Sequence, residues 1–166
     1  MFALKPISRD SVAGALAKAE RYRLLNEPGE AESICRDILE VEPDNQPAHI
    51  SLVLALTDQI AHDAQAFAGA LAAAGSLRSD YDRRYYAGIA WERRAKARHH
   101  GGGQGASPYV YEWIMTALHL YQEAEAIRPP GNDDAVLRWN ACVRFLRRHK
   151  ELAPRAEEMA EPIVSE

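Results

Sequence analysis

Residues Ala19–Pro43, with the sequence AERYRLLNEPGEAESICRDILEVEP, predict a hairpin of two helices. Two apolar patterns with helical spacing stand on either side of a four-residue break, Asn26–Gly29. Proline is tolerated in the first turn of a helix, so Pro28 can begin the second helix, whereas Pro43 ends it. One such hairpin cannot bury its apolar face alone, so we expect neighbouring helices to stack against it.

The composition is that of an ordinary globular protein with one domain or one short repeat array. Of 166 residues, 47% are hydrophobic and 27% are charged, and alanine-rich segments without polar–apolar alternation favour an all-α fold. The formal charge of −4 argues against nonspecific nucleic-acid binding. We find no apolar run long enough to cross a membrane and no signal peptide. Cys35 and Cys142 lie in apolar helical patterns typical of buried thiols. We therefore expect a reducing, cytoplasmic location, with a disulfide as the alternative.

The hairpin carries small, aromatic and apolar residues at fixed spacing and ends on a proline. These residues are Ala19, Tyr22, Ala31, Cys35, Ile38 and Pro43. Their spacing resembles the tetratricopeptide repeat (TPR) family, in which small residues let two helices cross closely. The chain departs from the family pattern at Cys35, which replaces an aromatic residue, and at Ala15, which replaces a tryptophan.

A second match to the family pattern lies further along the chain. It comprises Gly88, Trp91, Ala117, Tyr121, Ala124 and Pro129. Gly88 and Ala117 are 29 residues apart, whereas the equivalent Ala19 and Ala31 are 12 apart, so this unit holds about 17 extra residues. The unit between the two matches, about 46–76, keeps the pattern only in degenerate form.

The resemblance implies an all-α, right-handed solenoid of helical hairpins, with about three helix pairs and a C-terminal capping helix over residues 11–149. Residues 1–10 would form an N-terminal arm, and residues 150–166 an acidic C-terminal tail. We expect a helix over Asp80–Arg98, followed by a flexible insertion loop at about 99–107 because glycines disfavour helix. The alternative fold is a helical bundle that matches the repeat by chance.

The resemblance also implies a concave groove that binds a peptide or helix from another protein. The groove residues carried over from the family are Leu16, Glu20, Arg23, Ile50, Leu54, Asp58, Tyr85, Ile89, Glu92 and Arg93. This mixture suits a partner with two or three apolar anchors and a charged terminus. The alternative for the apolar members is that they pack against neighbouring helices.

The segment Arg78–Arg98 offers a second candidate site because it holds seven basic and three acidic residues among aromatic ones. Arginines with aromatics can grip carboxylates, phosphates or bases, and the glycine-rich loop 101–105 could cradle an anion before the next helix. The candidate residues are Arg94, Arg98, His99 and His100. The alternative is a solvated helix face whose cations pair with nearby acids.

We find no motif for a metal, a cofactor or catalysis. His99 and His100 are adjacent, so they cannot both face one metal ion from a regular helix, and no Glu or Cys accompanies them at ligand spacing. The leading hypothesis is therefore a non-enzymatic adaptor for another protein. A homodimer is one alternative, and a binder or enzyme of an anionic small molecule or nucleic acid is the other.

Overall fold

The computed structural model describes residues 2–102 and 106–152. Over these residues the chain is all-α, as the sequence predicts, with a short 3-10 helix, η1 (Arg9–Ser11), before seven α-helices and no β-strand. The α-helices are α1 (Val12–Leu24), α2 (Pro28–Val41), α3 (Gln46–Gln59), α4 (Ala66–Gly75), α5 (Asp80–Gly101), α6 (Ala106–Ala126) and α7 (Asp134–Arg148).

Polar residues and a proline fix several helix starts. The side chain of Asn45 accepts a hydrogen bond from a backbone N–H of α3 at 2.9 Å, and that of Ser79 accepts one from α5 at 3.2 Å. Pro28 is the first residue of α2, where no backbone donor is needed. Asn26 adopts a left-handed conformation with φ of 61°, which turns the chain between α1 and α2.

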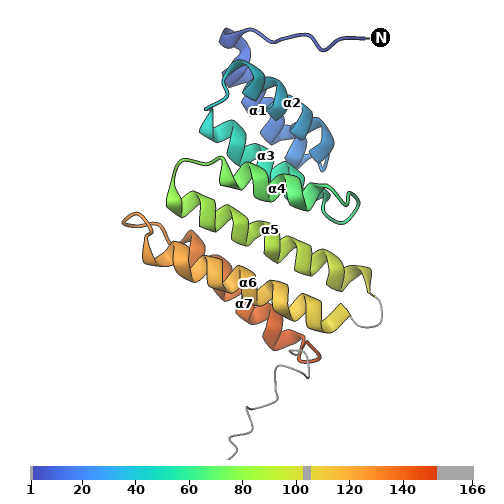
Figure 1. Cartoon of the computed structure of the whole chain (residues 1–166), viewed down its shortest axis with the longest axis vertical. Coiled ribbons are helices and arrows are strands. Elements are labelled where there is room, and N and C mark those ends of the chain that lie inside the picture. The colour runs from blue at the N-terminus through green and yellow to red at the C-terminus, as the bar shows by residue number, and fades with distance from the viewer. Residues whose placement is uncertain (1, 103–105, 153–166) are drawn as a thin grey trace, which may run out of the picture.

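The helices stack in chain order along the long axis of the molecule, and each packs against the helix before it and the helix after it (Figure 1). In addition, α3 contacts both α1 and α5. The N-terminal arm and α7 therefore lie at opposite ends of the stack. This order brings side chains of α1, α3 and α5 onto neighbouring positions, although they are far apart in the sequence.

The small residues predicted at the helix crossings are buried. Ala19 of α1 and Ala31 of α2 are both fully buried in the same hydrophobic cluster. In the second match, Gly88 of α5 lies directly against the ring of Tyr121 of α6, which is also fully buried. Both helix pairs therefore approach closely where the sequence has a side chain of minimal size.

The extra residues between Gly88 and Ala117 lie mostly in helices. α5 and α6 have 22 and 21 residues, whereas α1 and α2 have 13 and 14. The expected flexible loop at 99–107 is therefore too long, because its first three residues belong to α5 and its last two to α6. The expansion builds a longer helical hairpin.

The predicted end of the fifth helix at Arg98 is wrong by one turn. α5 continues to Gly101, and Gly102, with φ of 65°, ends it. Gly102 has ψ of −168°, and this combination of φ and ψ is accessible essentially to glycine alone, so Gly102 ends the helix without unwinding its last turn. Most of the predicted anion loop 101–105 lies outside the described residues.

The start of the predicted acidic tail is packed against the helices. Leu152 is only 8% exposed and belongs to the hydrophobic cluster formed by α5, α6 and α7. Its N–H donates to the carbonyl of His149 at 3.0 Å, which closes a turn after α7. The remainder of the predicted tail, residues 153–166, lies outside the described residues.

Substitution of Gly88 tests the close approach of α5 and α6. In Gly88→Ala, the added Cβ would lie 2.6 Å from Cε1 of Tyr121, so the buried ring must move. Overpacking costs about 1–3 kcal/mol and better helix propensity offsets about 1 kcal/mol, so we expect a net loss of up to about 2 kcal/mol in urea unfolding. Gly14→Ala is the control, because a Cβ there meets no atom within 4 Å and stability should not fall.

Candidate functional site

A polar cavity of about 580 Å³, which we call the charged cavity, opens where five helices and two of the turns converge. Residues of α1, α2, α3, α5 and α7 line it. The lining residues are Arg23, Asn26, Pro28, Thr57, Asp58, Ala61, Glu92, Arg93, Lys96, Ala97 and Arg138. Its volume is in the range of sites that hold a small ligand or a few side chains of a peptide.

Asp58 of α3 is held between two arginines. Nε and Nη2 of Arg23 lie 3.0 and 2.9 Å from its Oδ2, while Nη1 of Arg93 donates to its Oδ1. Each carboxylate oxygen therefore has its own guanidinium partner. These charge-assisted bonds join α1, α3 and α5 along one wall of the cavity.

Glu92 of α5 is a buried carboxylate, with only 1% of its surface exposed. Nζ of Lys96 lies 2.5 Å from Oε1, and the hydroxyl of Tyr121 donates to Oε2 at 2.7 Å. Nη1 of Arg138, from α7, lies 3.7 Å from Oε1. A buried charge is tolerated only when it is paired and hydrogen-bonded, and Glu92 meets both conditions with partners on α5, α6 and α7.

Burial and the charge of Glu92 keep Tyr121 and Arg138 each in one protonation state. Burial and then the Glu92 charge raise the pKa of Tyr121 far above its ordinary value, so its hydroxyl stays a neutral donor. For Arg138, burial on its own lowers the pKa, but the Glu92 charge and a hydrogen bond with Tyr85 raise it by more. Arg138 therefore remains a cation.

The charged cavity carries a net positive charge of two, because four cationic side chains face two carboxylates. The cations are Arg23, Arg93, Lys96 and Arg138, and the carboxylates are Asp58 and Glu92. Both carboxylates are already engaged by cations, whereas an arginine has five N–H groups and can serve more than one anion. Binding of an acidic group is the chemistry that this arrangement supports.

Four of the ten predicted groove residues line the charged cavity, namely Arg23, Asp58, Glu92 and Arg93. The apolar ones contribute mainly to packing. Ile89 is 2% exposed in the cluster of α5, α6 and α7, against which Leu54 and Tyr85 pack. Leu16 packs on a separate cluster near the N-terminal end, Ile50 is half-buried and Glu20 is exposed.

The four residues of the second candidate site fall into separate groups. Arg94 lies between two aromatic rings, with its guanidinium carbon 4.1 Å from the ring centres of both Phe67 and Trp113. It lines a smaller cavity of about 420 Å³ together with Arg98. His99 contacts Phe145 of α7, whereas His100 is exposed. The structure does not gather these residues into a single site.

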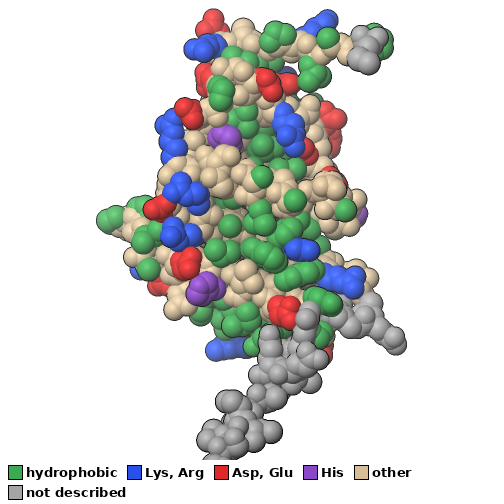
Figure 2. All heavy atoms as spheres, in the orientation of Figure 1, with side chains coloured by type: hydrophobic (Ala, Val, Ile, Leu, Met, Phe, Trp, Pro, Cys, Tyr) green, Lys and Arg blue, Asp and Glu red, His purple; other side chains and the backbone are tan. Residues whose placement is uncertain are grey.

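Acids close to the basic segment neutralise most of its charge. Five of its seven basic residues make ion pairs, which join Arg78 to Asp44, Arg83 to Asp80, Arg84 to Glu123, Arg93 to Asp58 and Lys96 to Glu92. Figure 2 shows acidic and basic side chains intermingled on the face in view. These pairs favour the solvated helix face over a nucleic-acid platform.

Sequence reasoning missed the three partners of Glu92. Lys96 could have been found, because it follows Glu92 by four residues and such a pair lies on one helix face. Tyr121 was recognised only as a packing residue. Arg138 belongs to the helix that we expected to act only as a cap, and no local spacing connects it with Glu92.

Comparison of the chain with protein-family models, with curated proteins and with solved structures found no significant match. Among the helices that the structure describes, none combines the length and apolar character needed to cross a membrane. The site is therefore interpreted from its own geometry.

Glu92→Gln should lower the free energy of unfolding by about 2–4 kcal/mol, because it leaves Lys96 and Arg138 without the carboxylate that compensates them. Urea unfolding followed by circular dichroism measures the loss. Glu123→Gln is the control, since Glu123 is 44% exposed and each of its two ion pairs is worth at most about 1 kcal/mol. Equal stability of the two variants would contradict the role given to Glu92.

Neither cysteine should react in the folded protein. Both are fully buried free thiols. Burial raises the pKa of Cys35 to about 11, and burial together with the Glu92 charge raises that of Cys142 to about 12. The thiolate is the reactive form, so iodoacetamide at about pH 8 should label both only after denaturation, as mass spectrometry would show. Rapid labelling of the native protein would contradict this burial.

Proposed function

We propose that this chain is a TPR-like interaction module, a right-handed stack of helical hairpins that holds a segment of another protein. The pairing of α1 with α2, α3 with α4 and α5 with α6 supports this proposal, with α7 packed on the last pair. The burial of Ala19, Ala31, Gly88 and Ala117, where the family pattern has small residues, supports it further.

The charged cavity is the observation that carries the proposal. Cations from α1, α5 and α7 converge there and exceed the carboxylates by two. The complementary feature of a partner is an acidic group, either an Asp or Glu side chain or a free C-terminal carboxylate. Asp58 engages two N–H-bearing nitrogens of Arg23 and one of Arg93, which leaves further donors on both guanidinium groups for that acid.

Two exposed apolar residues in the chain segment that borders the cavity are the second contact that we propose for the partner. Leu24 and Leu25 are 88% and 60% exposed at the end of α1. They lie in the chain between Arg23 and Asn26, which both line the cavity. An extended segment could therefore place its acidic group in the cavity and an apolar side chain against the leucines, which is the mixed surface that a peptide groove needs.

The module acts by binding, without chemistry of its own. The acids and bases of the cavity are engaged with one another, and Cys142, beside Glu92, is a buried thiol of raised pKa. Most of the arginine and lysine residues of α5 already form ion pairs within the chain. These features disfavour catalysis and a nucleic-acid partner, which needs a run of free cations.

A peptide selection tests the proposal. A pool of random peptides with free C-termini is passed over the immobilised protein, and retained peptides are sequenced and resynthesised. We expect acidic peptides, which should lose binding when their acidic groups are replaced by amides. Arg93→Gln should weaken binding at least about tenfold, because a charged hydrogen bond is worth about 1.5–3 kcal/mol.

Arg84→Gln is the matched control for that variant. It removes the same charge from the same helix, but Arg84 pairs with Glu123 and does not line the cavity. Its affinity for the selected peptides should stay within about twofold of the parent protein. Equal affinities of the Arg93 and Arg84 variants, with both folded by circular dichroism, would reject the charged cavity as the binding site.

A further inference from the structure

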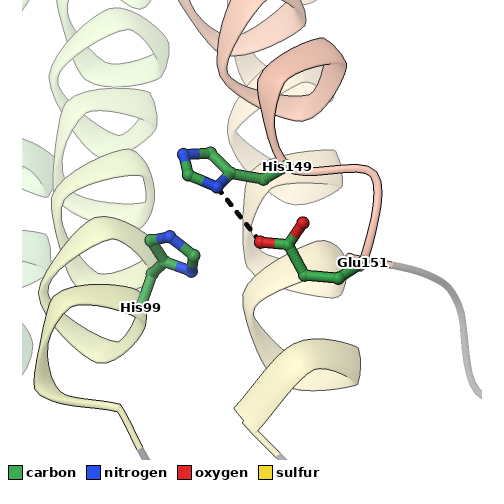
Figure 3. A group of neighbouring side chains, drawn as sticks. All are labelled: His99, His149 and Glu151. Carbon is green, nitrogen blue, oxygen red and sulfur yellow. Dashed lines mark hydrogen bonds and ion pairs between the residues drawn. The ribbon is translucent and has the colours of Figure 1, made fainter.

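Three potential metal-binding side chains meet at the end of the stack, away from the charged cavity. His99 lies in the last turn of α5, His149 caps the C-terminus of α7, and Glu151 follows in the turn after it. Figure 3 shows the three side chains pointing toward one another across the gap between the two helix ends. Among the described residues, this is the one group of three His, Cys, Asp or Glu with such proximity.

The spacing of the three groups approaches that of a metal site. Their candidate ligand atoms all lie within 4.8 Å of one another. Nδ1 of His149 is 3.1 Å from Oε1 of Glu151, whereas tetrahedral zinc with ligands about 2.0–2.1 Å away separates its ligand atoms by roughly 3.3 Å. His99 reaches the same separation by a shift of at most about 1.5 Å, which rotation of its side chain can supply.

The turn that carries two of these ligands is held in place. The N–H of His149 bonds to the carbonyls of Phe145 and Leu146, so the ring projects from the last turn of α7. The hydroxyl of Ser107, at the start of α6, donates to the carbonyl of Glu151 at 2.6 Å. Burial of Leu152 anchors the following residue. A site whose backbone is fixed before binding loses less entropy when the ion arrives.

Packing also orients the two imidazoles. The ring of Phe145 meets His99 edge-on with centres 5.3 Å apart, and its centre lies 4.6 Å from that of His149. The centres of the two histidine rings are 4.2 Å apart. His149 and Glu151 keep 31% and 61% of their side-chain surfaces exposed, so an ion has a route in and room for a water molecule.

We propose that His99, His149 and Glu151 bind one zinc-class divalent ion, with water in the fourth position. Two imidazoles and one carboxylate are ligands that zinc prefers, whereas calcium and magnesium require mainly oxygen ligands. The ion joins the end of α5 to the end of α7, so it stabilises the C-terminal end of the stack. This site is independent of the proposed peptide-binding function.

A second His–Glu pair provides a matched control within the chain. Nε2 of His119 lies 3.1 Å from Oε1 of Glu123 on the exposed face of α6, the same distance as in the His149–Glu151 pair. It has no third His, Cys, Asp or Glu at ligand distance among the described residues. Removal of His119 should therefore leave specific metal binding intact.

Metal titration of the untagged, chelator-treated full-length protein tests the site. Isothermal titration calorimetry with Zn²⁺ should show one ion per chain, and saturating Zn²⁺ should raise the unfolding midpoint. His149→Gln and Glu151→Gln should each weaken binding at least about tenfold, whereas His119→Gln should stay within about twofold. Bound Co²⁺ should give the visible absorption of a four-coordinate ion in the parent protein and in His119→Gln only.

Three results would overturn the proposal. The first is the absence of stoichiometric Zn²⁺ binding by the parent protein. The second is equal affinity of all variants, which would indicate adventitious binding by surface histidines. The third is equally strong binding of Mg²⁺ or Ca²⁺, which would indicate a carboxylate site without imidazole ligands. Circular dichroism of each variant establishes that it is folded before its affinity is compared.

Discussion

The buried carboxylate of Glu92 constrains the C-terminal half of the stack. A charge withdrawn from water needs partners with good geometry, and Glu92 draws Lys96 of α5, Tyr121 of α6 and Arg138 of α7 to one point. Its burial and its pairing largely offset one another, so the net contribution to stability is small, but removal of any partner is costly. The helices must therefore pack in the arrangement that keeps all three partners in reach.

The same constraint sets the charge of the cavity. Lys96 and Arg138 face both Glu92 and the cavity, just as Arg23 and Arg93 face both Asp58 and the cavity. Without the two carboxylates, four cations from three different helices would repel one another. With them the cations are held in position, yet an excess of positive charge remains for an acidic ligand. The ion pairs that hold the helices together thus also prepare the surface that we propose for binding.

Local spacing in the sequence predicted the features that depend on neighbouring residues. It predicted the all-α fold, the burial of Ala19 and Ala31, and the helix against which Gly88 packs, because small residues at fixed intervals mark helix crossings. It predicted that Glu92 faces the groove, but it did not predict that Glu92 is buried. The arginine that completes its environment, Arg138, comes from the distant helix α7. The convergence of His99 with residues 149 and 151 was missed for the same reason: local ligand spacing cannot report a contact between chain segments about 50 residues apart.

The lengthened α5 explains why both candidate sites use this helix. At 1.5 Å per residue it spans about 33 Å, against about 21 Å for α3, so its last turns extend past the earlier helices. Glu92, Lys96 and His99 follow one another at intervals of four and three, which places them on one face. These three residues contact α7 in the same order: Glu92 pairs with Arg138, Lys96 lies over the ring of Phe145, and the ring of His99 contacts that of His149. The buried carboxylate of Glu92 thus holds α7 near its N-terminus, whereas His99, His149 and Glu151 meet at the C-terminus of α7. A metal ion bound by these three residues would hold the C-terminal end of a helix whose N-terminal end is already held.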